Sequence, residues 1–252
     1  MSNTAFALEA RDLSRSFGGF YALRGVNFRL GLNCVHAVIG PNGAGKTTLF
    51  NLLTKQLPPT AGRIFHNGID VTSLGMPAMA RRGVVRSFQI SAVFGSLTVR
   101  ENIELALLRG QGLSWNCLGT IARHRAVTER SGALIERFDL GAYAEIAAAS
   151  LPYGRKRVLE LATTLALEPK VLLLDEPMAG LGREDIGWIS KLIREVASGR
   201  TVLLVEHNMK VVAELADRIT VMVRGEILAE GTYAEVSARP DVKAAYTGQG
   251  HG

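Results

Sequence analysis

A glycine-rich stretch near the start of the chain has the residues and the spacing of a phosphate-binding loop. Residues 40–48 fit the pattern G-x-x-x-x-G-K-T, and they lie between an expected strand at 33–39 and an expected helix. Glycine at three of these positions lets the backbone curl so that its N–H groups converge, and the next helix adds the positive end of its dipole. The sequence therefore predicts a polyphosphate site formed by Gly40, Pro41, Asn42, Gly43, Ala44, Gly45, Lys46, Thr47 and Thr48.

Three side chains of this loop have separate expected roles. Lys46 supplies a mobile positive charge for the β- and γ-phosphates, the Thr47 hydroxyl is placed to bind Mg²⁺, and Thr48 reaches the α-phosphate. The alternative is a glycine-rich turn that binds nothing. The strand before the loop and the helix after it favour the phosphate site.

Two acids end a continuous apolar strand farther along the chain. Residues 171–174 are Val-Leu-Leu-Leu, and Asp175 and Glu176 follow them. We expect this strand to lie beside the strand that leads into the phosphate-binding loop, with both acids at the ligand-binding edge of the sheet. Phosphoryl transfer to water needs a carboxylate near the magnesium ion and a second group that orients or deprotonates the water. Asp175 suits the first role and Glu176 the second; two solvated acids at a turn are the alternative.

Two neutral side chains follow other expected strands at the same edge. His207 comes after the strand 201–205, where its imidazole could hydrogen-bond a γ-phosphate. Gln89 comes after a strand at 84–88, where its amide can reach Mg²⁺ or the attacking water. We interpret both as catalytic, with Gln89 also a candidate metal ligand. The alternative for a single histidine is a structural role.

An aromatic-rich segment at 15–21 lies just upstream of the phosphate-binding loop. Phe17 or Tyr21 could stack on a nucleotide base from this position. Ordinary core packing is the alternative for either ring.

The order of the expected elements indicates how these residues are brought together. Alternating apolar residues predict two antiparallel strands around 6–10 and 26–30, and Asn67-Gly68 predicts a hairpin in a small separate sheet. Residues 99–149 have helical spacing, and strands then alternate with helices as in a parallel sheet covered on both faces. We therefore expect an α/β core with an antiparallel β-subdomain and an inserted α-helical subdomain.

Composition limits the classes of protein that the chain could represent. Its 252 residues, 47% of them hydrophobic, can bury one ample core. Cys34 and Cys117 are the only cysteines, so neither a disulfide framework nor structural zinc is expected. No window approaches 18 consecutive apolar residues, so we expect neither secretion nor a membrane span. The net charge is +6, but the basic residues are dispersed without interleaved aromatic rings, so nucleic-acid binding is not expected.

These motifs, in this order, resemble the ATP-binding cassette family. The similarity covers nearly the whole chain and includes a signature stretch at 151–155 and the segment Ala179-Gly180-Leu181-Gly182. It implies a single ATPase domain over residues 1–252, with a RecA-like P-loop NTPase core and a helical subdomain inserted at about 90–165. It also implies ATP and Mg²⁺ as cofactors.

The resemblance further implies roles for individual residues. Phe17 would stack on adenine, Glu176 would be the general base, and His207 would sense the γ-phosphate. Two cassettes would form a head-to-tail dimer around two ATP molecules. The signature residues Pro152, Tyr153 and Gly154 would then face the ATP held by the partner.

More narrowly, the chain resembles the ATPase subunits of branched-chain amino acid importers. The stretches that carry this similarity are 85–89, 97–103 and 205–209, together with the tyrosine in the signature. It implies transmembrane permease subunits, a second ATPase subunit and, indirectly, a substrate-binding protein as partners. It also implies a peripheral position on the cytoplasmic face of the inner (plasma) membrane.

Two departures from the family pattern concern the dimer. Pro152 and Arg155 replace the serine and glutamine of the usual signature, and Gly182 replaces an acidic or amide residue. Proline is compatible with the first turn of a helix, so the helix should form without the serine hydroxyl. We therefore expect a non-identical ATPase partner whose intact signature serves the P-loop of this chain.

Two other classes of function are weighed against transport. A cassette protein acting on ribosomes or DNA usually has two cassettes or long inserts, and this chain has neither. A nucleotide-gated scaffold without hydrolysis would lack Glu176 or His207, and both are present. Export of another cargo is a further alternative, because the cargo does not touch this subunit.

Overall fold

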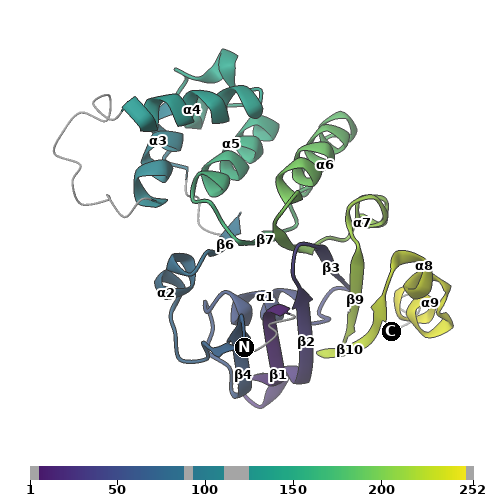
Figure 1. Ribbon diagram of the computed structural model, residues 1–252. Coiled ribbons are helices and arrows are strands. Elements are labelled where there is room, and N and C mark those ends of the chain that lie inside the picture. Colours follow the sequence, from purple (N-terminus) through teal and green to yellow (C-terminus); the bar gives the residue numbers. More distant parts are fainter. Residues whose placement is uncertain (1–5, 88–92, 111–124, 248–252) are drawn as a thin grey trace.

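The computed structural model describes residues 6–87, 93–110 and 125–247, which form two sheets and the helices around them (Figure 1). The smaller sheet is antiparallel, with the strand order β2-β1-β4-β5. Its strands are β1 (Phe6–Phe17), β2 (Phe20–Gly31), β4 (Ala61–His66) and β5 (Ile69–Asp70). Asn67 and Gly68 have φ angles of 49° and 75°, as the predicted hairpin turn between β4 and β5 requires.

The larger sheet has the strand order β10-β9-β3-β8-β7-β6. All neighbours are parallel except β10, which pairs antiparallel with β9. Its strands are β3 (Val35–Ile39), β6 (Val84–Ser87), β7 (Val171–Asp175), β8 (Thr201–Val205), β9 (Arg218–Val223) and β10 (Glu226–Gly231). The apolar runs of β7 and β8 are buried on both faces, which confirms the expected covered sheet.

The predicted neighbour of β3 is wrong. We expected the strand that ends in Asp175 to lie beside the strand that leads into the phosphate-binding loop. Instead β8 lies between them and pairs with β3 on one side and with β7 on the other. Strand order depends on contacts between distant segments, which the local apolar pattern of each strand does not contain.

The helices cover the larger sheet and extend beyond it. Among them, α3, α4 and α5 form a group set apart from the antiparallel sheet, and they share one hydrophobic cluster with α6 (Figure 1). The α-helices are α1 (Lys46–Leu53), α2 (Met76–Arg81), α3 (Val99–Gly110), α4 (Arg125–Arg137), α5 (Tyr153–Ala166), α6 (Arg183–Ala197), α7 (Met209–Leu215), α8 (Tyr233–Ala238) and α9 (Pro240–Thr247). Short 3₁₀ turns η2 (Gly141–Tyr143) and η3 (Ala148–Ser150) lead into α5.

Local backbone geometry sets the ends of two helices. Helix α1 ends at Leu53, because Lys55 has a φ of 62°, which a continuing helix does not allow. Helix α8 opens with a capping box of Thr232 and Glu235. In the described ranges no helix has the length and apolar character that a membrane crossing requires.

Candidate active site

The loop between β3 and α1 has the backbone conformation that its glycines predict. Gly40, Gly43 and Gly45 have φ angles of 151°, 77° and 99°. A Cβ atom on Gly40 would lie 2.2 Å from the Met222 carbonyl oxygen, and one on Gly45 would lie 2.7 Å from the Ala22 carbonyl oxygen. Glycine is therefore required at both positions, and the loop curls into the start of α1.

Lys46, the first residue of α1, bends back over this loop. Its ammonium donates to the Gly40 carbonyl at 2.7 Å and to the Pro41 carbonyl at 2.9 Å. The residue is only 8% exposed, and burial lowers the pKa of Lys46, although the charges of Glu176 and Asp175 oppose that shift. Both acceptors are neutral carbonyls, so the ammonium remains open to pairing with a phosphate group.

The strand register brings the other predicted groups to the same edge of the sheet. Asp175 at the end of β7 lies opposite Val205 at the end of β8, and Val205 lies opposite Val38 of β3. Glu176 directly follows β7, and His207 lies two residues after the end of β8. The edge that carries the phosphate-binding loop therefore also carries Asp175, Glu176 and His207.

Asp175 forms a buried ion pair that the sequence reasoning did not anticipate. Arg86, on β6, donates to Asp175 Oδ2 at 2.5 Å, and the two side chains are 6% and 13% exposed. The same guanidinium bonds Asn51 Oδ1 at 2.6 Å and Gln56 Oε1 at 2.8 Å. Arg86 thus joins the Asp175 carboxylate to the end of α1. A charged residue inside an expected buried strand was the only signal for it.

The predicted metal ligands have chemistry that fits Mg²⁺. Asp175 accepts from Arg86 through Oδ2, and within the described residues its Oδ1 accepts no hydrogen bond. The Thr47 hydroxyl lies in the first turn of α1, on an exposed residue. Carboxylate and hydroxyl oxygens are hard ligands of the kind that Mg²⁺ binds. Gln89, the third predicted ligand, lies outside the described residues.

Glu176 and His207 face each other across the ends of β7 and β8. Glu176 Oε1 and His207 Nδ1 are 4.0 Å apart, and the side chains are 44% and 65% exposed. This separation is longer than a hydrogen bond, so neither polar group is satisfied by the other. Glu176 also has a φ of 47°, an uncommon conformation for a residue other than glycine.

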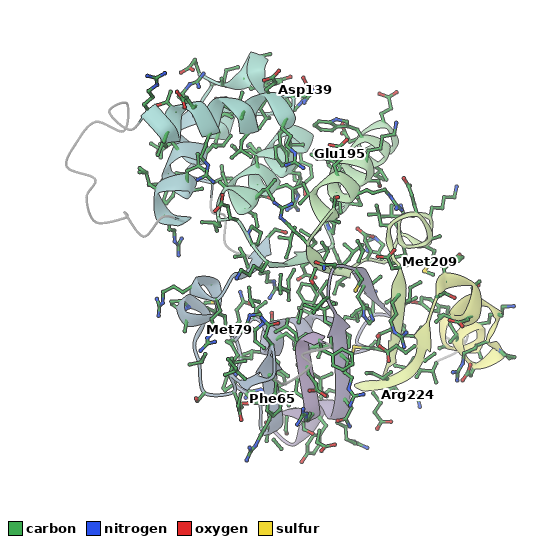
Figure 2. All side chains as sticks on the ribbon, in the orientation of Figure 1. Phe65, Met79, Asp139, Glu195, Met209 and Arg224 are labelled. Carbon is green, nitrogen blue, oxygen red and sulfur yellow. The ribbon has the colours of Figure 1, made fainter. Side chains whose placement is uncertain are left out.

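Aromatic rings lie beside the phosphate-binding loop. A hollow of about 530 Å³ is lined by Gly43, Tyr21, Arg24 and Phe20, and by Arg224, labelled at the β9–β10 turn in Figure 2. Phe17 and Tyr21 are 43% and 44% exposed, so neither ring packs in the core as the alternative reading required. Arg15 covers the Phe17 ring at 4.6 Å from its centroid. Tyr21 lines the hollow and Phe17 does not. Both rings stay candidates for base stacking, because both are exposed.

The signature residues lie at the start of α5. Pro152 is the N-cap of this helix and makes no side-chain capping bond, so it lies one position before the first-turn place that we expected. Helix α5 forms without the usual serine, as predicted. Arg155 donates to Asp139 Oδ2 at 3.0 Å and stacks over the Trp188 ring at 4.7 Å. The basic side chain that replaces glutamine therefore packs against its own chain.

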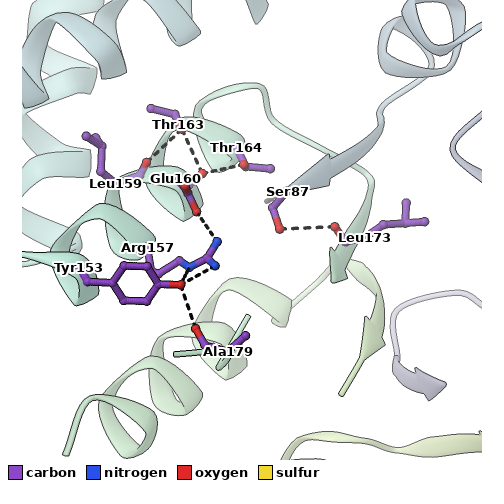
Figure 3. A network of polar contacts seen from close by, with 9 residues as sticks. All are labelled: Ser87, Tyr153, Arg157, Leu159, Glu160, Thr163, Thr164, Leu173 and Ala179. Atoms are coloured by element: carbon purple, nitrogen blue, oxygen red, sulfur yellow. Dashed lines mark hydrogen bonds and ion pairs between the residues drawn. The ribbon is translucent and has the colours of Figure 1, made fainter. Parts of the chain in front are cut away.

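Tyr153 connects the signature to the segment that follows Glu176 (Figure 3). Its hydroxyl donates to the Ala179 carbonyl at 3.0 Å and accepts from Arg157 Nη2 at 2.7 Å. Arg157 in turn pairs with Glu160 at 3.0 Å. A Cβ atom on Gly180 would lie 3.1 Å from the Tyr153 ring, so a glycine fits there best. This network is a second feature that no sequence motif revealed.

Comparisons with known proteins identify relatives along nearly the whole chain. Residues 23–179 match the family model described as ABC transporter, and residues 226–252 match the model described as branched-chain amino acid ATP-binding cassette transporter. The chain is 38% identical to the high-affinity branched-chain amino acid transport ATP-binding protein BraF of Pseudomonas aeruginosa. It is 39% identical to the corresponding protein LivG of Escherichia coli. Each match covers 96% of this chain and 98% of the relative.

Solved structures give the same result for the fold. A nucleotide-free ATP-binding cassette from an ABC transporter superposes with a TM-score of 0.82 at 28% identity. That match covers 96% of this chain and 98% of the other.

Proposed function

The chain belongs to the ATP-binding cassette transporter family, and we propose that it is the ATP-hydrolysing subunit of an importer for branched-chain amino acids. The observation that carries this proposal is the meeting of the phosphate-binding loop, Asp175, Glu176 and His207 at one edge of the sheet. The names of the relatives and the match at residues 226–252 support the cargo class.

Each group at this edge has a proposed part in hydrolysis. The N–H groups of residues 40–48 and the Lys46 ammonium hold the phosphates, and Phe17 or Tyr21 stacks on the adenine. Glu176 accepts a proton from the attacking water, and His207 hydrogen-bonds the γ-phosphate. Thr47, Asp175 and Gln89 would hold Mg²⁺, which neutralises phosphate charge when bound. The 4.0 Å between Glu176 and His207 leaves both groups available for the substrate.

We also propose how the chain is organised and assembled. Residues 1–252 act as one ATPase domain with a helical subdomain at about 90–165. This domain attaches peripherally to permease subunits at the cytoplasmic face of the membrane, and a substrate-binding protein delivers the cargo. Nucleic acid is not a partner.

A non-identical ATPase subunit is the proposed partner in the dimer. Pro152 caps α5 without a side-chain hydrogen bond, so the start of this helix lacks the hydroxyl that a partner's γ-phosphate would meet. An intact signature from the other subunit would serve Lys46 and Glu176 of this chain. Full turnover by this chain alone would contradict the proposal, and turnover that rises on mixing with the second subunit supports it.

Uptake by cells tests the cargo. In a native-host strain without this gene, uptake of labelled leucine, isoleucine and valine should fall and should return with the wild-type gene. A gene encoding Lys46→Ala should not restore it. Unchanged uptake in the deletion strain would favour another cargo or export.

A further inference from the structure

Glu206 is a buried carboxylate between the two loops that carry Glu176 and His207. The residue follows β8 and is 0% exposed. None of the ion pairs found in the described ranges includes it. A buried charge is costly unless hydrogen bonds compensate it. The groups that compensate this carboxylate therefore indicate what it holds in place.

Three backbone N–H groups point at this carboxylate. The Met178 N–H donates to Oε1 at 3.1 Å, and the His207 and Asn208 N–H groups donate to Oε2 at 3.0 Å each. Met178 lies two residues after Glu176, in the loop that follows β7. One oxygen thus fixes the loop of Glu176 and the other fixes the loop of His207.

The conformation of Glu176 needs such a constraint. Its φ of 47° lies in the left-handed region, where a residue with a side chain is strained and persists only if its surroundings hold it. The Glu176 N–H donates to the Val205 carbonyl at 2.9 Å, which fixes the loop on one side. The bond from Met178 to Glu206 fixes it on the other.

We propose that Glu206 is a positioning residue that sets the distance between Glu176 and His207. It therefore acts mainly on the rate of hydrolysis, because its three hydrogen bonds come from the loops that follow β7 and β8. This inference rests on the proposed roles of Glu176 and His207. No motif in the sequence assigns Glu206 a role of this kind.

Glu206→Gln tests the proposal, because it keeps the size of the side chain and replaces one acceptor oxygen with a donor. A donor would then face one of the three N–H groups and push its loop away. A displacement of the order of 1 Å at reacting groups can cost roughly 10²-fold in rate. We expect kcat to fall by about 10- to 10²-fold, with the dissociation constant for MgATP changed less than about twofold.

The matched control is Glu104→Gln, a change at another buried glutamate. Glu104 is 6% exposed and accepts from Ser131 Oγ at 3.1 Å, within the group of helices α3 and α4. This variant should keep kcat. Both variants are measured with the partner subunits with which the chain purifies, and thermal unfolding is recorded for each.

A double-mutant cycle separates positioning from a general loss of structure. If Glu206 acts through His207, then Glu206→Gln should lower kcat much less in a His207→Ala background than in the wild type. An equal factor in both backgrounds, an unchanged kcat, or parallel losses of kcat, affinity and thermal stability would each overturn the proposal. Absence of hydrolysis in the wild-type assembly would instead contradict the proposed function, so the two failures are distinguishable.

Discussion

The phosphate-binding loop and the signature end of α5 are built in different ways. At the loop, main-chain geometry does the work: glycine φ angles curl the backbone, and Lys46 is 8% exposed and bonded to two carbonyls of the loop itself. At the signature, exposed side chains make the contacts, and Tyr153 is 49% exposed. Lys46 is thus held by backbone atoms of its own loop, whereas the signature is held by partly exposed side chains.

This difference indicates how strongly each region should respond to substitution. A cradle of backbone N–H groups tolerates few changes, because its shape depends on glycine at fixed positions. A surface of side chains can lose one group, as Pro152 illustrates, while its helix still forms. We therefore expect changes at the loop and the sheet edge to have larger effects than changes at the signature.

The largest effect should come from Glu176→Gln. Removing the proposed base should lower turnover by about 10²- to 10⁴-fold, because the attacking water loses its proton acceptor. ATP should remain bound and stabilise the dimer, since Glu176 is not part of the loop. Phosphate release and gel filtration with MgATP measure the two consequences. Hydrolysis at the wild-type rate would remove Glu176 from the mechanism.

Arg86→Gln should lower the free energy of unfolding. The change leaves Asp175, which is 13% exposed, without its cation, and breaking a buried pair typically costs about 3–5 kcal/mol. Urea unfolding gives the free energy of unfolding directly.

The control for Arg86 is Arg125→Gln, the same change in an exposed pair. Arg125 and Glu129 are 92% and 65% exposed, so their pair should contribute about 0.5 kcal/mol or less. Equal losses of unfolding free energy in the two variants would show that the buried Arg86–Asp175 pair stabilises the protein no more than an exposed pair.

Tyr153→Phe should have the smallest effect of the three. It removes the hydroxyl that bonds the Ala179 carbonyl, a loss of about 1 kcal/mol, and so lowers Tm by about 2–4 °C. The affinity for MgATP should not change, because the phosphate-binding loop is intact. Tyr233→Phe on α8 is the matched control. A weaker affinity for MgATP in Tyr153→Phe would contradict the claim that the phosphate-binding loop binds nucleotide independently of the signature.

Features that depend on neighbouring residues in the sequence were predicted from it. The Asn67-Gly68 turn and the phosphate-binding loop each follow from a few adjacent positions. The groups placed at the ends of β7 and β8 also reached one edge, because parallel strands share a direction.

Features that depend on contacts between distant segments were not predicted from the sequence, or were predicted wrongly. The place of β8 between β3 and β7 is a property of the whole sheet. The partners of Arg86 come from α1 and β7, and the three donors to Glu206 come from two loops. In the sequence Arg86 was a charge inside an apolar strand and Glu206 a charge directly after one. Only the fold could identify the groups that each of them bonds.

The most direct test of the account is the affinity of Lys46→Ala for MgATP. Charged hydrogen bonds are worth about 1.5–3 kcal/mol, so the dissociation constant should rise roughly 10- to 150-fold in a variant that is still folded. Isothermal titration with MgATP measures it. Binding as tight as that of the wild type would contradict the claim that this loop and its ammonium hold the phosphates.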